Sequence, residues 1–156
     1  EAIRAYKKAL ECDANQPIVL VNLATVYINQ DRLPQARRTL EQAIAMDSSL
    51  SVAHERMGYL NWRDQRLDEA AESYRRAISL NPRNARAYAG LGVVRMTQHL
   101  NEPSRESLRV EAVEAWHQSL ELDPEQPKLR ALVDKYRIRK DAPVLSLDGL
   151  GRGEGG

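Results

Sequence analysis

The sequence predicts an all-α protein, a solenoid of antiparallel helix hairpins. The first observation is a fixed interval, because Ala2, Ala36 and Ala70 stand 34 residues apart. A self-similar period of this length is typical of helical repeat arrays. The second is the spacing of apolar residues within each unit, which recur every three or four positions as on one face of a helix. The third is that turn-forming residues gather between these apolar segments.

Residues 1–16 carry only the second half of a unit. Ala2, Tyr6 and Ala9 occupy the small, bulky and small places of a second helix, and no first helix precedes them. We therefore interpret 1–16 as a half repeat and expect the chain to be a piece of a longer protein. One hairpin alone cannot bury its apolar face, so the stacking of neighbours is expected to form the core.

Two full repeats follow, at 17–50 and 51–84. In the first helix of each, a larger apolar residue is followed by Ala24 or Gly58. Small residues at such a place let two antiparallel helices cross at close distance. Pro34 falls in the first turn of a second helix, where its missing N–H has no helical partner.

Large residues alternate with the small ones along the second helices. Leu40, Tyr74 and Trp116 hold the same place in successive units. We expect them to fill the spaces between neighbouring hairpins.

The third repeat, 85–124, contains an eight-residue insertion. Its second-helix alanine is Ala112, eight positions later than the interval from Ala70 requires, and the extra residues lie within 98–111. We expect the second helix to begin early, near Pro103 or Ser104, and to run about two extra turns. The insertion is either a lip that contacts a partner or a tolerated loop expansion, since surface insertions cost little closure entropy.

Residues 125–140 are predicted to form a capping helix, and residues 141–156 a flexible Gly-rich tail. An apolar stripe at helical spacing suits the cap to cover the last hairpin; it consists of Leu129, Leu132, Val133 and Tyr136. The opposite side of the cap is basic, with Lys128, Arg130, Lys135, Arg137, Arg139 and Lys140. This basic side is either a solvated face or a surface for nucleic acid or an acidic peptide.

Composition excludes several classes of protein. Hydrophobic residues make up 42 % of the chain and charged residues 29 %, with a formal net charge of +1, which is neither a disordered nor a strongly basic nucleic-acid-binding balance. No apolar run approaches the ~18 residues of a membrane span. Cys12 is the only cysteine, and His54, His99 and His117 have no partner at metal-ligand spacing. We therefore expect no catalytic centre, no metal and no cofactor.

The repeated residues resemble the tetratricopeptide repeat family over about residues 1–136. The resemblance rests on the 34-residue period, the small residues after Leu or Met in the first helix, the paired alanines of the second helix and the closing proline. It implies a right-handed superhelix with a concave binding groove. Asn61 and Arg95 depart from the pattern where Tyr27 has the family's usual tyrosine, which argues against tight packing there. Ser119 replaces the final alanine of the last unit.

The resemblance also implies which residues line the groove. In the family, these are the second, fifth, ninth, twelfth and thirteenth places of each first helix, which step by three or four and so form one stripe. The matching residues, with the neighbouring Arg56, are Ile18, Val21, Thr25, Ile28 and Asn29, then Val52, Glu55, Arg56, Tyr59, Trp62 and Arg63, then Arg86, Ala89, Val93, Met96 and Thr97.

Within this groove, Ile28, Trp62 and Met96 are predicted to form an apolar row rimmed by arginines. Such a patch is typical of an interaction surface, and Trp is enriched at binding hot spots. The predicted partner is an apolar helix or an extended peptide with some acidic residues. Trp62→Ala is expected to weaken its binding without lowering stability. The alternative is that Trp62 only packs against the neighbouring hairpin.

The family's chaperone-binding members hold a terminal carboxylate with Lys and Asn on their first helices. The matching places are Val21, Thr25, Arg56, Gly90 and Arg86. Because the first cationic place is taken by Val21, we expect no binding of this carboxylate-clamp kind.

The predicted function is a non-catalytic protein–protein interaction scaffold that holds a peptide or helix of a partner in its concave groove. A regulatory or substrate-docking module of a larger enzyme, such as a glycosyltransferase or kinase, is the alternative. Binding of nucleic acid through the basic cap is a third class and is disfavoured by the net charge. Self-association is a further alternative, and membrane binding is not expected.

Overall fold

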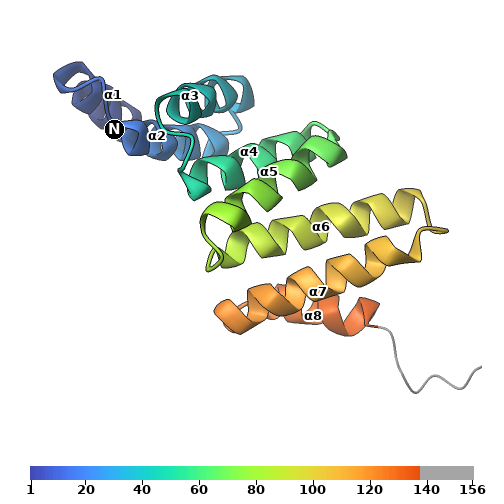
Figure 1. The fold of residues 1–156 in the computed structure, drawn as a ribbon. Coiled ribbons are helices and arrows are strands. Elements are labelled where there is room, and N and C mark those ends of the chain that lie inside the picture. The colour runs from blue at the N-terminus through green and yellow to red at the C-terminus, as the bar shows by residue number, and fades with distance from the viewer. Residues whose placement is uncertain (138–156) are drawn as a thin grey trace, which may run out of the picture.

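The computed structural model describes residues 1–137, and helices are its only regular elements over that range (Figure 1). The predicted tail at 141–156 and the last residues of the predicted cap lie outside the described residues. The helices are α1 (Ala2–Cys12), α2 (Pro17–Asn29), α3 (Leu33–Met46), α4 (Ser51–Arg63), α5 (Leu67–Leu80), α6 (Ala85–Asn101), α7 (Glu106–Leu122) and α8 (Pro127–Tyr136).

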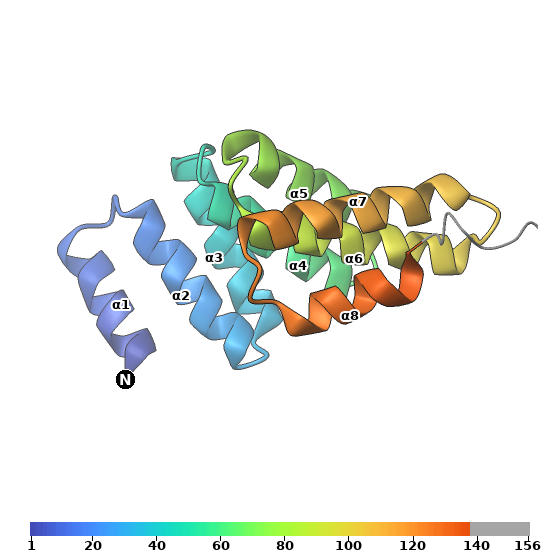
Figure 2. The same cartoon turned by 90° about the horizontal axis from the view of Figure 1, so that it is seen from below.

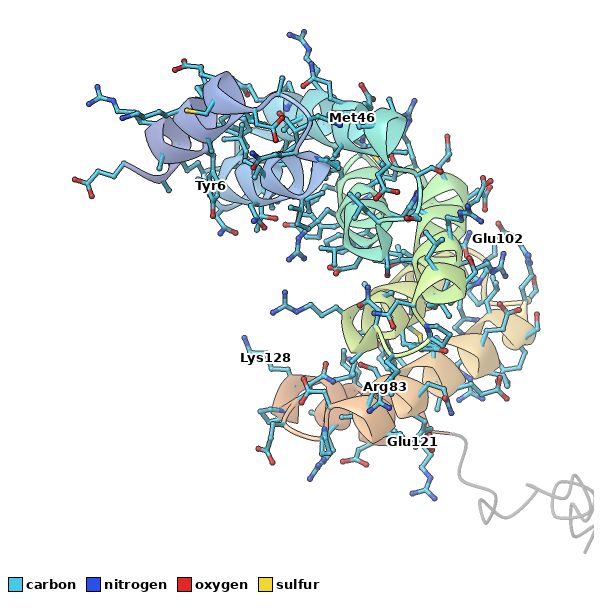
Figure 3. All side chains as sticks on the ribbon, turned by 60° about the vertical axis from the view of Figure 1, so that its left-hand side comes forward. Tyr6, Met46, Arg83, Glu102, Glu121 and Lys128 are labelled. Atoms are coloured by element: carbon cyan, nitrogen blue, oxygen red, sulfur yellow. The ribbon has the colours of Figure 1, made fainter. Side chains whose placement is uncertain are left out.

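The helices stack as antiparallel hairpins in a single arc, which confirms the predicted all-α solenoid (Figures 1 and 2). The pairs α2–α3, α4–α5 and α6–α7 each form one hairpin. The first helices of these pairs lie on the inner side of the arc, and the second helices lie on its outer side (Figure 3). Helix α8 follows α7 and takes the place of the first helix of a fourth hairpin.

Small residues at the helix crossings are buried, as the repeat pattern predicted. Ala36 and Ala43 of α3 and Ala70 and Ala77 of α5 have no exposed surface. With only a methyl group at these places, the paired helix can approach closely and its larger side chains can fill the spaces beside the crossing.

The bulky residues of the second helices face glycines on the first helices. A Cβ atom added to Gly92 would lie 2.3 Å from the indole Cδ1 of Trp116, and one added to Gly90 would lie 2.3 Å from Cζ of Tyr74. A larger side chain on the second helix is therefore matched by a glycine on the first helix that packs against it. Leu40, the smallest of the three bulky residues, lies in the same core cluster as Ala24.

The turns within the first two hairpins share one backbone conformation. Asp31 and Gln65, which are 34 residues apart, both have φ near 60° and so lie in the left-handed region. The following amide closes each turn, as the Arg32 N–H donates to the Tyr27 carbonyl at 2.8 Å and the Arg66 N–H to the Asn61 carbonyl at 2.9 Å.

The insertion in the third hairpin is divided between two helices, so α7 (17 residues) is only three residues longer than α5 (14 residues) and does not gain the two extra turns expected. Helix α6 runs on to Asn101, four residues beyond the place where α4 ends in its own repeat, and α7 begins only at Glu106. The insertion thus lengthens both arms of the hairpin. Its end carries Leu100, which is 59 % exposed, and it projects from the arc in Figure 2.

The two departures from the family's tyrosine are buried, so the expectation of loose packing there was wrong. Asn61 accepts a hydrogen bond from Nη1 of Arg37 at 3.0 Å, and Nη1 of Arg95 donates to Gln98 at 2.7 Å. A carboxylate oxygen of Glu111 lies 2.8 Å from Nε of Arg95. Polar partners from the same helix and from neighbouring helices thus replace the packing of a tyrosine ring.

Candidate functional site

The inner side of the arc is built from equivalent places on successive first helices. The second place of each helix is occupied by Ile18, Val52, Arg86 and, on α8, Lys128. All four side chains are exposed; Ile18 retains 51 % of its surface and Val52 39 %. Lys128 projects into the opening of the arc, whereas Met46, Glu102 and Glu121 lie on its outer side (Figure 3).

Three of the predicted groove residues are buried and offer little surface to a partner. Val21 lies in the core cluster formed by α2, α3 and α4. Met96 is 4 % exposed, because Leu129 and Val133 of α8 pack against the same cluster. The predicted apolar row is therefore interrupted at Met96. The third buried residue, Glu55, belongs to a polar cluster.

Glu55 is a buried carboxylate between α2, α4 and α6. It accepts a hydrogen bond from Nη1 of Arg56 at 2.6 Å, and Nε of Arg56 donates to the hydroxyl of Thr25 at 3.3 Å. Burial raises the pKa of Glu55, against the opposing charges of Arg56 and Arg86. The cluster links two consecutive first helices, and it leaves Arg56 with its own counter-ion.

A second polar cluster lies at the other end of the same helices. Arg63 forms an ion pair with Asp31 at 2.9 Å and donates a hydrogen bond to the Tyr59 hydroxyl at 3.0 Å. Its guanidinium also stands over the Tyr59 ring, 5.9 Å from the centroid. This arginine is exposed but already paired, so a ligand would have to compete with Asp31 for it.

Trp62 is half-buried, so its removal is now expected to lower stability as well as to weaken binding. The indole packs against the cluster around Ala70, Tyr74 and Val94, and its ring centroid is 6.1 Å from that of Tyr59. Its indole nitrogen is buried without a hydrogen-bond partner in the described part of the chain. Loss of this side chain would remove core contacts as well as inner surface.

The remaining predicted groove residues are mostly less exposed than Ile18 and Val52. The hydroxyl of Thr25 donates to the carbonyl of Val21, and that of Thr97 to the carbonyl of Val93, so both are satisfied within their helices. Of this group Asn29 is exposed, and five residues are half-buried, namely Thr25, Ile28, Ala89, Val93 and Thr97.

Lys128 was missed as an inner-surface residue by the sequence prediction. It was assigned only to the basic face of the cap, although it stands 42 residues after Arg86, the repeat interval plus the eight-residue insertion. Counting the period through the insertion would have placed it in the same row.

Residues 1–137 hold no group of three or more His, Cys, Asp or Glu side chains placed to bind a metal ion. His54 contacts the backbone carbonyl of Ser48 and His99 that of Arg105. Among the described helices, none has the length and apolar character needed to cross a bilayer.

Stacked helix hairpins with a row of exposed side chains on the inner side define a helical-repeat solenoid. Two family models match the chain, "Tetratricopeptide repeat" over residues 1–50 and "TPR repeat" over residues 63–98. The chain belongs to the tetratricopeptide repeat family.

Curated relatives resemble the chain over most of its length. RNA polymerase II-associated protein 3 of Homo sapiens is 26 % identical over 140 residues, which are 88 % of this chain and 21 % of that protein. Hsp70-Hsp90 organizing protein 3 of Arabidopsis thaliana is 26 % identical over 125 residues, 80 % of this chain and 22 % of that protein. The chain thus spans about a fifth of the length of these relatives. These likenesses point to a protein-interaction module.

Solved structures share the fold. The crystal structure of MamA has a TM-score of 0.70 at 25 % identity, with 86 % of this chain and 74 % of that chain covered. The first TPR of Spaghetti (RPAP3), bound to the HSP90 peptide SRMEEVD, has a TM-score of 0.69 at 19 % identity, with 80 % and 92 % covered.

Proposed function

We propose that the chain is a non-catalytic protein–protein interaction module that holds a peptide segment of its partner on the inner side of the arc. The observation that carries this proposal is the exposure of Ile18 and Val52 on that side. These two apolar side chains stand at equivalent places of stacked helices, and burial of their exposed surface by a ligand is favourable.

The relatives support the same proposal. One solved neighbour holds a chaperone peptide, and Hsp70-Hsp90 organizing protein 3 is named for the proteins that it organises. Peptide binding is therefore compatible with this architecture, while the inner residues of this chain decide what it binds.

A peptide-display selection tests the proposal. Linear peptides enriched on the immobilised wild-type chain should lose about tenfold or more in affinity when Ile18 and Val52 are both changed to Asp, because a carboxylate would be buried against an apolar ligand. Met46→Asp is the matched control, since Met46 is 41 % exposed on the outer side. Equal binding to the wild type and the double variant, with both folded by circular dichroism, would contradict an inner-surface site.

A carboxylate clamp for chaperone tails is not expected in this chain. Val21 is buried where the clamp's first cation would stand, and Arg56 is committed to Glu55. Calorimetric titration of SRMEEVD should therefore show no difference between the free-acid and the C-terminally amidated peptide. A micromolar dissociation constant that disappears on amidation would show that a clamp exists.

A further inference from the structure

The row of second-place residues changes its chemistry halfway along the arc. Ile18 on α2 and Val52 on α4 are apolar, and Arg86 on α6 and Lys128 on α8 are cationic. Because the four places are equivalent in the repeat, they follow one another along the inner side in helix order. A ligand that crosses the row meets an apolar half and then a cationic half.

The cationic half has no counter-ion of its own. Neither Arg86 nor Lys128 forms an ion pair or a side-chain hydrogen bond within residues 1–137. The other inner arginines differ, since Arg56 is paired with Glu55 and Arg63 with Asp31. The charge of Arg86 acts on Glu55, but this carboxylate is buried and bonded to Arg56. Two exposed positive charges therefore remain available to carboxylates from outside.

From this arrangement we infer that the inner surface takes a peptide of two parts, with apolar residues at the Ile18–Val52 half and acidic residues at the Arg86–Lys128 half. The inference rests on the proposed function and adds the order of the ligand's residues. Apolar burial supplies binding free energy, while charge complementarity fixes which end lies over α2 and which over α8. A peptide with the opposite order would place carboxylates against Ile18 and leave both cations unpaired.

Nucleic acid fits this row less well. Phosphates repeat along a strand and would use cations along the whole row, whereas half of this row is apolar and the formal net charge of the chain is only +1. An acidic peptide uses both halves. Competition by a single-stranded oligonucleotide is therefore a discriminating measurement.

An exchange of the two halves tests the inference. In the exchange variant, Ile18→Arg and Val52→Lys are combined with Arg86→Ile and Lys128→Val, so the composition is unchanged, and all four sites are exposed. Linear peptides are selected from one random library on the wild type and on this variant. The wild type should enrich peptides with an apolar block on one side and an acidic block on the other. The exchange variant should enrich the reversed order of blocks along the peptide.

A second variant removes only the two positive charges, so it tests the cationic half without the four exchanged residues. Arg86→Gln with Lys128→Gln should lower the affinity of the wild-type peptides about tenfold at low salt and remove the acidic block from newly selected peptides, while the apolar block persists. Circular dichroism melting verifies that each variant is folded.

The outcomes separate the two proposals. No enriched peptide on the wild type, or enrichment insensitive to Ile18 and Val52, would end the proposed function itself. Enrichment that depends on these residues but keeps the same block order in the exchange variant would overturn only the two-part ligand. A third outcome is that an oligonucleotide displaces the selected peptides from the wild type and no longer binds the Arg86→Gln, Lys128→Gln variant. This result would show a nucleic-acid surface and would also overturn the two-part ligand.

Discussion

Replacing Trp116 by alanine should lower the free energy of unfolding by about 3–5 kcal/mol. The indole is 1 % exposed and lies in the cluster that joins α6, α7 and α8. Its Nε1 donates to the carbonyl of Ala89 at 3.3 Å, and its ring centroid is 6.1 Å from that of Tyr136. Truncation would leave a cavity bounded by three helices, so the loss combines transfer free energy with the cost of the void.

Chemical denaturation followed by circular dichroism measures this loss. His117→Ala is the matched control, because His117 is the next residue of α7 and is exposed; it should change the free energy of unfolding by less than about 0.5 kcal/mol. In a repeat protein, the weakened units can unfold before the others. Hydrogen exchange should therefore show the largest loss of protection in α7 and α8. A change below about 1 kcal/mol would mean that Trp116 is not a core residue.

Much of the fold could be predicted because the repeat imposes the same steric demand in every unit. Ala36 and Ala70 recur at the interval where two helices cross, and both are fully buried. The extent of the helices around the insertion could not be predicted in the same way. Residues 98–107 are mostly polar and hold no apolar stripe that ties them to one helix, so either neighbour could extend into them.

Buried polar residues illustrate a second limit of the sequence. Asn61 and Arg95 break the pattern of their own helix, and apart from Gln98, which accepts from Arg95, their neighbours along the chain do not show which groups they meet. Their partners Arg37 and Glu111 come from other helices, 24 and 16 residues away in the sequence. A pattern within one helix indicates which side a residue faces but not which group will meet it there.

The candidate site, like the fold, could be predicted only in part. Ile18 and Val52 of the predicted stripe are exposed, while the groove itself stays a prediction. Met96 was misplaced because α8, which covers it, follows the insertion and comes from a distant part of the chain. For the same reason Lys128 was not recognised as the fourth residue of the row.

Replacing Gly92 by alanine should also lower the free energy of unfolding, because Gly92 is the small residue paired with the bulky Trp116. The added Cβ would lie 2.3 Å from Cδ1 and Nε1 of Trp116 and 2.9 Å from the backbone carbonyl oxygen of Ala112. Trp116 is enclosed and cannot swing away, and the carbonyl belongs to the backbone of α7. Alanine favours a helix over glycine by up to about 1 kcal/mol, but overpacking a core of this kind costs more, and we expect a net loss of about 2 kcal/mol or more.

The sign of the Gly92→Ala effect should reverse when Trp116 is first changed to leucine. That double variant carries Ala and Leu at the two places that Ala24 and Leu40 hold in the first hairpin, where both are buried in one cluster. With the indole gone, the alanine methyl group has room, and its helix propensity and its filling of the cavity should both stabilise the fold. A double-mutant cycle by chemical denaturation measures the coupling between the two sites, expected at about 2–3 kcal/mol. If Gly92→Ala lowers stability equally in both backgrounds, the steric contact with Trp116 is not what requires glycine there.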